Sequence, residues 1–150
     1  MEGISNEIDE SVLILNRANK GVILLIECNS IPLRETIIRI LKDRIKFKFY
    51  DITLDEKYKN LPGKIYMDFK SKKIDENTVV LVREIENARP EIIGYLNWNR
   101  ETFLELKLRT VIFCSTDFMD EIMKRAPDFY RFSYRITIKE TNEVNFHNKI

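Results

Sequence analysis

The sequence predicts an α/β protein, a three-layer αβα sandwich around a mostly parallel sheet of about five strands. Three continuous apolar stretches, residues 22–28, 78–82 and 109–114, show no alternation of apolar and polar side chains. Such runs are typical of central parallel strands that helices cover on both faces. Segments with helical spacing separate them. Strands that alternate with helices imply right-handed crossovers and helices on both faces of the sheet.

The first two helices have recognisable ends. Residues 6–19 carry an amphipathic pattern, which Ser5 or Asn6 can cap and which Gly21 is placed to end. A second helix follows the first apolar stretch, because Pro32 stands where the first helical turn accepts proline.

The middle of the chain is more polar. Residues 46–52 alternate and predict a strand with its two phenylalanines on one face. Residues 53–77 are rich in lysine, with a turn expected at Pro62-Gly63 and a short element at residues 65–69.

Two further helices are expected after the second apolar stretch. The first covers about residues 91–106, with a break near residues 97–99. The second begins at Thr116 or Asp117, either of which can cap it, and ends at Ala126-Pro127.

The segment from residue 130 to residue 138 alternates most regularly and predicts the last strand. Five of its residues are expected to face the core: Tyr130, Phe132, Tyr134, Ile136 and Ile138. The outward row Arg131, Arg135 and Lys139 would contact phosphates or protect an edge strand from pairing. We expect one domain over residues 1–140 and a flexible tail over residues 141–150.

Composition and net charge argue against some classes of partner but indicate no particular function. The chain has 150 residues, a net charge of +1, and 44% apolar and 33% charged residues, which is ordinary for a globular domain. The charge gives no reason to expect nucleic acid or a membrane surface as a partner. Neither a membrane-spanning segment nor a signal peptide is expected, so the predicted location is the cytoplasm.

The two cysteines, Cys28 and Cys114, end apolar runs. One disulfide is conceivable, but two reduced thiols in the core are expected, because neither cysteine has the spacing of a metal or redox motif. With one histidine in the chain, metal sites built on His and Cys are excluded by count.

Val22–Leu41 resembles the strand, phosphate loop and helix of AAA-type ATPases with the chemistry removed. The phosphate-loop pattern is Gly-x4-Gly-Lys-Ser/Thr. Aligned on Thr36, this sequence has Asn29 and Arg34 in place of the two glycines and Glu35 in place of the lysine. A carboxylate ~4 Å from a like charge costs about 4 kcal/mol at an effective dielectric of ~20. Arg34 and the helix start could still hold another anion.

Val79–Ala88 resembles the magnesium-site strand of the same family, in which Asp-Glu follows the apolar run. Arg83-Glu84 stands there instead, and an arginine cannot coordinate a cation. The strand end predicts solvated carboxylates at Glu84 and Glu86. A third strand, Val111–Asp117, resembles the family's sensor strand, with Thr116 at its polar tip or as a helix cap.

This resemblance covers about residues 20–138. It implies a P-loop-NTPase-like or Rossmann-like fold without the helical lid of active modules, no bound cofactor and no catalytic residue. The expected function is therefore a non-catalytic interaction or regulatory module.

Residues 96–103, LNWNRETF, and 125–132, RAPDFYRF, are less generic. They resemble a degenerate AAA/STAND-like domain near the N-terminus of large bacterial signalling and defence NTPases that carry STAND, TPR or caspase-like modules. The resemblance implies a protein partner, such as a larger NTPase, a protease or a CRISPR-type component. The motif consists of Asn97, Trp98, Arg100, Arg125, Pro127, Asp128 and Phe129.

The residues of that motif also allow structural expectations. Pro127-Asp128-Phe129 would form a rigid helix-to-strand turn. Arg100 and Arg125 would pair with Asp128 or Glu101, and Trp98 would anchor either the core or a partner.

Two other functions stay open. Glu27, Asp51 and Glu84 could converge at the carboxyl ends of parallel strands, where open α/β folds bind ligands. They would then form a magnesium site of a nuclease or phosphotransferase. Alternatively, the edge strand or the N-terminal helix would build a structural homo-oligomer.

Overall fold

The computed structural model describes residues 4–55, 59–98 and 100–139, without the side chains of Trp98, Arg100 and Leu104. The strands are β1 Val22–Glu27, β2 Lys48–Thr53, β3 Thr78–Arg83, β4 Arg109–Cys114 and β5 Tyr134–Thr137. The helices are α1 Ser5–Arg17, α2 Ile31–Arg44, α3 Leu61–Lys70, the 3-10 helix η2 Ile85–Ala88, α4 Glu91–Trp98, α5 Arg100–Glu105, α6 Thr116–Arg125 and α7 Pro127–Phe132.

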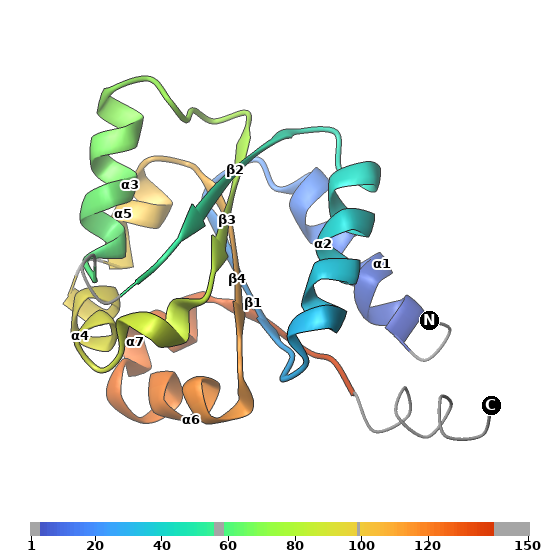
Figure 1. Cartoon of the computed structure of the whole chain (residues 1–150). Coiled ribbons are helices and arrows are strands. Elements are labelled where there is room, and N and C mark those ends of the chain that lie inside the picture. Colours follow the sequence, from blue (N-terminus) through green and yellow to red (C-terminus); the bar gives the residue numbers. More distant parts are fainter. Residues whose placement is uncertain (1–3, 56–58, 99, 140–150) are drawn as a thin grey trace.

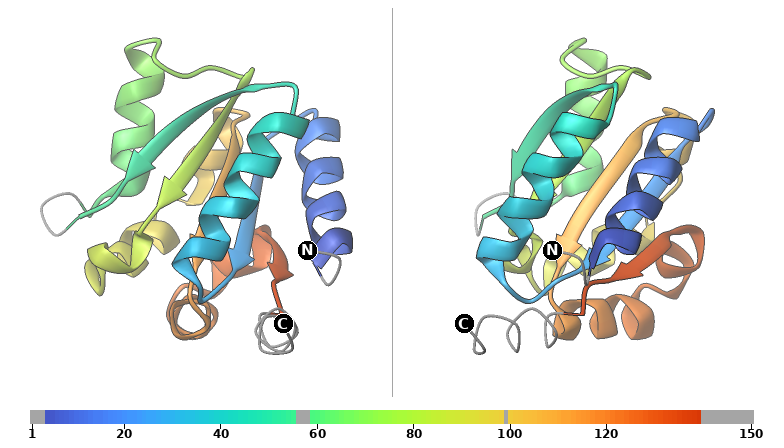
Figure 2. Two further views of the ribbon diagram at one scale, coloured as in Figure 1. Left: turned by 45° about the vertical axis from the view of Figure 1, so that its right-hand side comes forward. Right: turned by 90° about the vertical axis from the view of Figure 1, so that its right-hand side faces the viewer.

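The five strands form one parallel sheet in the order β2-β3-β4-β1-β5. In the register of β1, Ile26 lies opposite Phe113 of β4 and Ile136 of β5. The helices α1 and α2 cover one face, and α3 to α7 lie on the other (Figure 1). Figure 2, in its right-hand view, looks onto the face that α1 and α2 cover. The predicted three-layer α/β fold is confirmed.

The sheet has a hydrophobic core on each of its two faces, and this explains the unbroken apolar runs in the sequence. Along β1, Leu24 and Ile26 belong to the core under α1 and α2, whereas Ile23 and Leu25 belong to the core under the other helices. All four side chains are fully buried. A strand with a core on each face needs an apolar residue at every position, which is why alternation is missing.

The first helix differs from its prediction at both ends. Its N-cap is Ile4, without a side-chain cap, and it stops at Arg17, ahead of Gly21. The guanidinium of Arg109 explains the stop, because it donates hydrogen bonds to the carbonyl oxygens of Leu15, at 2.8 Å, and of Ala18. A side chain from β4 thus donates to carbonyl groups near the end of this helix, as backbone N–H groups would in a glycine-capped helix.

The expected turn at Pro62-Gly63 is wrong, because both residues lie in the first turn of α3. Asn60 caps this helix by accepting a hydrogen bond from the N–H of Gly63 at 2.9 Å. Proline suits this place, since its missing N–H would have no partner within the helix. The predicted proline in the first turn of α2 is confirmed. The break expected near residues 97–99 involves residue 99, which lies outside the described residues. The cap of α6 is Ser115 rather than Thr116 or Asp117.

The prediction of a strand from residue 130 is wrong in its first half. Tyr130 and Phe132 belong to α7, and the strand β5 begins only at Tyr134. Ile136 and Ile138 are buried as expected, but Phe132 is 54% and Tyr134 57% exposed. A few alternating aromatic residues do not distinguish a strand from a short helix, and Pro127 starts the helix here.

Cys28 and Cys114 are both buried thiols that are not joined in a disulfide, so the prediction of reduced thiols is confirmed. In the described part of the chain, no helix has the length and apolar character needed to cross a membrane. The tail prediction for residues 141–150 lies outside the described residues.

Candidate functional site at the carboxyl edge of the sheet

The carboxyl ends of the parallel strands bring three loops together. These loops connect β1 to α2, β3 to η2, and β4 to α6. In open parallel sheets, ligands bind at this edge. It is also the edge to which the three motifs of the sequence contribute their loops.

A buried ion pair joins all three loops. The Arg34 side chain is 6% exposed, and its Nη2 lies 2.8 Å from Oε2 of Glu86, which is 19% exposed. Nε of Arg34 donates to the carbonyl oxygen of Cys28 at 2.7 Å. The same Glu86 oxygen accepts a hydrogen bond from the backbone N–H of Ser115 at 2.6 Å. Arg34, which stands at the second glycine of the phosphate-loop pattern, therefore fills this loop with an internal contact.

The protonation of Glu86 reflects this network. Burial by itself raises the pKa of the Glu86 carboxyl, but the hydrogen bonds from Arg34 and from backbone N–H groups outweigh it. The pKa therefore lies below its ordinary value of 4.5. The expectation of a solvated strand end is wrong for Glu86, because η2 turns this side chain back toward α2.

The other two replaced residues compensate each other. Glu35, in place of the phosphate-loop lysine, forms an ion pair with Nη1 of Arg83, in place of the magnesium-binding aspartate. Nε of Arg83 also donates to Asp51 at 3.0 Å, and Lys42 lies 3.0 Å from the same Asp51 oxygen. The two positions therefore carry charges opposite to those of the family pattern, and these charges neutralise each other within the protein.

A polar cluster also links the end of β1 to the start of α6. The hydroxyl of Thr116 donates to Glu27 at 2.7 Å and accepts from the side-chain amide of Asn29 at 3.0 Å. The N–H of Thr116 donates to Oδ1 of Asn29 at 2.8 Å. Thr36, which alone matches the phosphate-loop pattern, donates its hydroxyl proton to the carbonyl oxygen of Pro32 within its own helix.

The three carboxylates Glu27, Asp51 and Glu84 have different surroundings. Glu27 bonds to Thr116, and Asp51 bonds to Lys42 and Arg83. Glu84 is exposed, in the left-handed region at φ 56°, just ahead of η2. Within the described ranges, no three His, Cys, Asp or Glu side chains group closely enough to hold a metal ion.

A cavity of about 250 Å³ lies beside these ion pairs, on the α2 face of the sheet. Its polar lining comes from Arg34, Glu35, Arg83 and Glu84, and apolar side chains such as Phe113 line the rest. Both signs of charge are present, and much of that charge is already paired.

The second motif lies at the junction of α4, α6 and α7. Oδ1 of Asn97 accepts a hydrogen bond from the N–H of Asp128 at 3.3 Å. Phe129 is fully buried and packs edge-on against Phe103, with ring centroids 5.6 Å apart.

The other expectations for this motif have mixed outcomes. Pro127-Asp128-Phe129 is the first turn of α7 rather than a helix-to-strand turn, because Pro127 starts a helix. Arg125 pairs with Glu121 at 3.7 Å rather than with Asp128, since the two lie one helical turn apart on α6. Asp128 lies 3.8 Å from Arg131. The side chains of Trp98 and Arg100 are outside the described part.

Sequence reasoning missed Arg109 as well as the Arg34–Glu86 pair. Arg109 is 9% exposed, and its three hydrogen-bond partners are the carbonyl oxygens of Leu15, Ala18 and Glu76. Burial lowers its pKa. An arginine that opens an apolar run is the one signal that could have indicated a buried role.

Comparisons with known proteins support the fold and nothing finer. No family model matches the chain, and no curated protein matches it. A solved structure of the RuvB Holliday junction branch migration motor of Thermotoga maritima is similar, with a TM-score of 0.54 and 13% identity. A variant of that protein gives a TM-score of 0.55 and 12% identity. Each match covers 90% of this chain and 45% of the RuvB chain, so this chain spans less than half the length of RuvB. At these identities the likeness concerns the fold alone: a five-stranded parallel sheet with helices on both faces, similar to that of RuvB.

Proposed function

We propose that this chain is a non-catalytic protein-interaction or regulatory module built on an AAA-like ATPase core. One observation carries the proposal. The loop that would cradle phosphates is closed by the Arg34–Glu86 pair, and the lysine and aspartate positions form the reversed pair Glu35–Arg83.

The polar groups at this edge are already engaged with one another. A phosphate loop presents backbone N–H groups and a lysine to the anion. Here the Arg34 side chain bonds to Cys28 and Glu86, and the Ser115 N–H donates to Glu86. Glu35 stands where the pattern has its lysine, and its carboxylate is paired with Arg83, so this position offers a phosphate no positive charge.

The biological context of the proposal comes from the second motif. The segments at residues 96–103 and 125–132 resemble a domain of bacterial signalling and defence proteins. The partner we propose is therefore a larger NTPase, a protease or a CRISPR-type component of a prokaryotic system. Products of neighbouring genes are the first candidates, and co-purification with tagged wild-type chain tests each one.

Calorimetry tests the part of the proposal that says the chain is not catalytic. Wild-type protein titrated with ATP or GTP and magnesium is expected to show no binding tighter than about millimolar and no phosphate release. The matched variant Glu35→Gln keeps the fold and removes one carboxylate, so weak triphosphate binding by this variant alone would attribute the exclusion to Glu35. Tight binding with turnover by the wild type would refute the proposal.

A further inference from the structure

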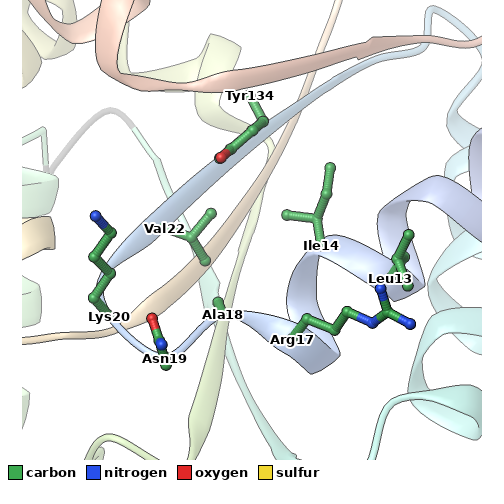
Figure 3. A pocket seen from close by; sticks show the side chains of 8 residues that line it. All are labelled: Leu13, Ile14, Arg17, Ala18, Asn19, Lys20, Val22 and Tyr134. Atoms are coloured by element: carbon green, nitrogen blue, oxygen red, sulfur yellow. The ribbon is translucent and has the colours of Figure 1, made fainter.

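A second hollow lies far from the carboxyl edge, where α1 ends and β1 begins. Its volume is about 300 Å³, the lower end of the range of about 300–1,000 Å³ that small-ligand pockets occupy. Ile14 and Ala18 line it from the end of α1, Val22 from the start of β1, and Tyr134 from the start of β5 (Figure 3).

The geometry of the sheet creates this hollow. β5 begins opposite Leu24, two residues after β1 begins at Val22. The Tyr134 side chain lies on the same sheet face as the buried Ile136, by the alternation of a strand. Tyr134 is nevertheless 57% exposed here, and Leu13 on α1 is 47% exposed. Two large apolar side chains thus border an apolar floor that no described element covers.

The charge at this hollow has a single sign. Arg17 and Lys20 are among its lining residues, and no carboxylate is. In Figure 3, Lys20 lies on one flank and Arg17, next to Leu13, on the other, with Ala18 and Val22 between them. Arg17 suits the last turn of α1 through the helix dipole, but Lys20 lies beyond the helix and gains nothing from it.

We propose that this hollow docks an acidic segment of the protein partner, with one apolar side chain of that segment on the floor and flanking Asp or Glu side chains beside Arg17 and Lys20. This inference rests on the proposed interaction function and names its surface. An apolar floor with cations on both flanks complements a peptide that combines an apolar anchor with negative charge. A neutral or basic peptide would leave the two cations uncompensated.

Selection from a displayed random peptide library tests the proposal whichever protein the partner is. The wild type is expected to enrich peptides in which Asp or Glu neighbours Leu, Ile or Phe. The double variant Arg17→Glu/Lys20→Glu is expected to lose these peptides and to enrich Lys or Arg beside the apolar residue. Absence of enrichment, or the same enrichment on both proteins, would overturn the proposal.

An enriched peptide is then titrated against three proteins. Arg17→Glu/Lys20→Glu is expected to weaken its binding about tenfold, since two exposed ion pairs of ordinary strength are reversed. The matched control Lys124→Glu changes a cation in the last turn of α6 and is expected to leave binding unchanged. An equal loss in the control would refute the hollow as the site. Nucleotide turnover by the wild type would refute the proposed function instead, so the two failures are distinguishable.

Discussion

Replacing Arg34 by methionine tests whether the buried pair holds the three loops together. The substitution keeps much of the side-chain volume but removes the partner of Glu86 and the donor to the carbonyl of Cys28. At 6% exposure, solvent cannot substitute for the lost contacts of Arg34. Removing one member of a buried pair costs about 3–5 kcal/mol. Glu86 keeps the Ser115 N–H and is 19% exposed, so we expect a loss near ~3 kcal/mol.

A double-mutant cycle separates the pair from its surroundings. Glu86→Gln alone leaves the guanidinium of Arg34 buried without a counter-charge, whereas Arg34→Met/Glu86→Gln removes both charges together. The double variant should therefore lose less stability than the sum of the single variants. We expect an interaction free energy of about 2 kcal/mol, within the range of roughly 0.5–3 kcal/mol that contacting residues show.

Urea unfolding followed by far-ultraviolet circular dichroism measures these values, provided that the dependence on urea concentration stays constant. Arg44→Met is the matched control, because it lies on the same helix and its pair with Asp9 is about half exposed. A surface pair of this kind contributes about 0–1 kcal/mol. If Arg34→Met costs no more than Arg44→Met, or if the interaction free energy is near zero, the pair does not close the loop as argued.

Three further predictions follow from the buried groups. Because the folded-state pKa of Glu86 lies below 4.5, its contribution to stability is complete above about pH 4.5 and is lost as the pH falls through the lower folded value; unfolding midpoints across acidic pH should fall more steeply for the wild type than for Glu86→Gln, and equal slopes would contradict this. Arg109→Met should cost about 2–4 kcal/mol, because buried carbonyl oxygens lose their donor, whereas the exposed control Arg39→Met should cost less than about 0.5 kcal/mol; thermal unfolding decides, and matching melting temperatures would contradict the role of Arg109. Burial raises the pKa of the Cys114 thiol, so both it and the buried Cys28 should react with an aromatic disulfide reagent only after denaturation; fast labelling of the native protein would show that the strand ends open.

Much of the fold could be predicted from the sequence because burial on both faces leaves a visible pattern. β4 was predicted with its observed bounds, and β1 and β3 to within one residue. The errors lie where short segments depend on their neighbours. Residues 130–132 alternate like a strand but form the end of α7, because Pro127 and the buried Phe129 determine a helix there.

The residues at the candidate site could be identified from the sequence, but their interaction partners could not. The sequence alone shows that Asn29, Arg34 and Glu35 follow the first apolar run. It also shows that Arg83 ends the second one. These statements require only the order of residues after an apolar run. No pattern in the chain could show where Glu86 would turn, since a charged residue after a strand is usually solvated.

The sequence by itself therefore determined the layered α/β architecture and which residues follow each apolar strand. The tertiary structure alone decided that Arg34 bonds to Glu86 and that Glu35 bonds to Arg83, both at one edge of the sheet. The physical reason is the different reach of the two kinds of interaction. Apolar burial acts on every residue of a strand and leaves a local pattern, whereas an ion pair depends on two atoms that only the folded chain brings within about 3–4 Å.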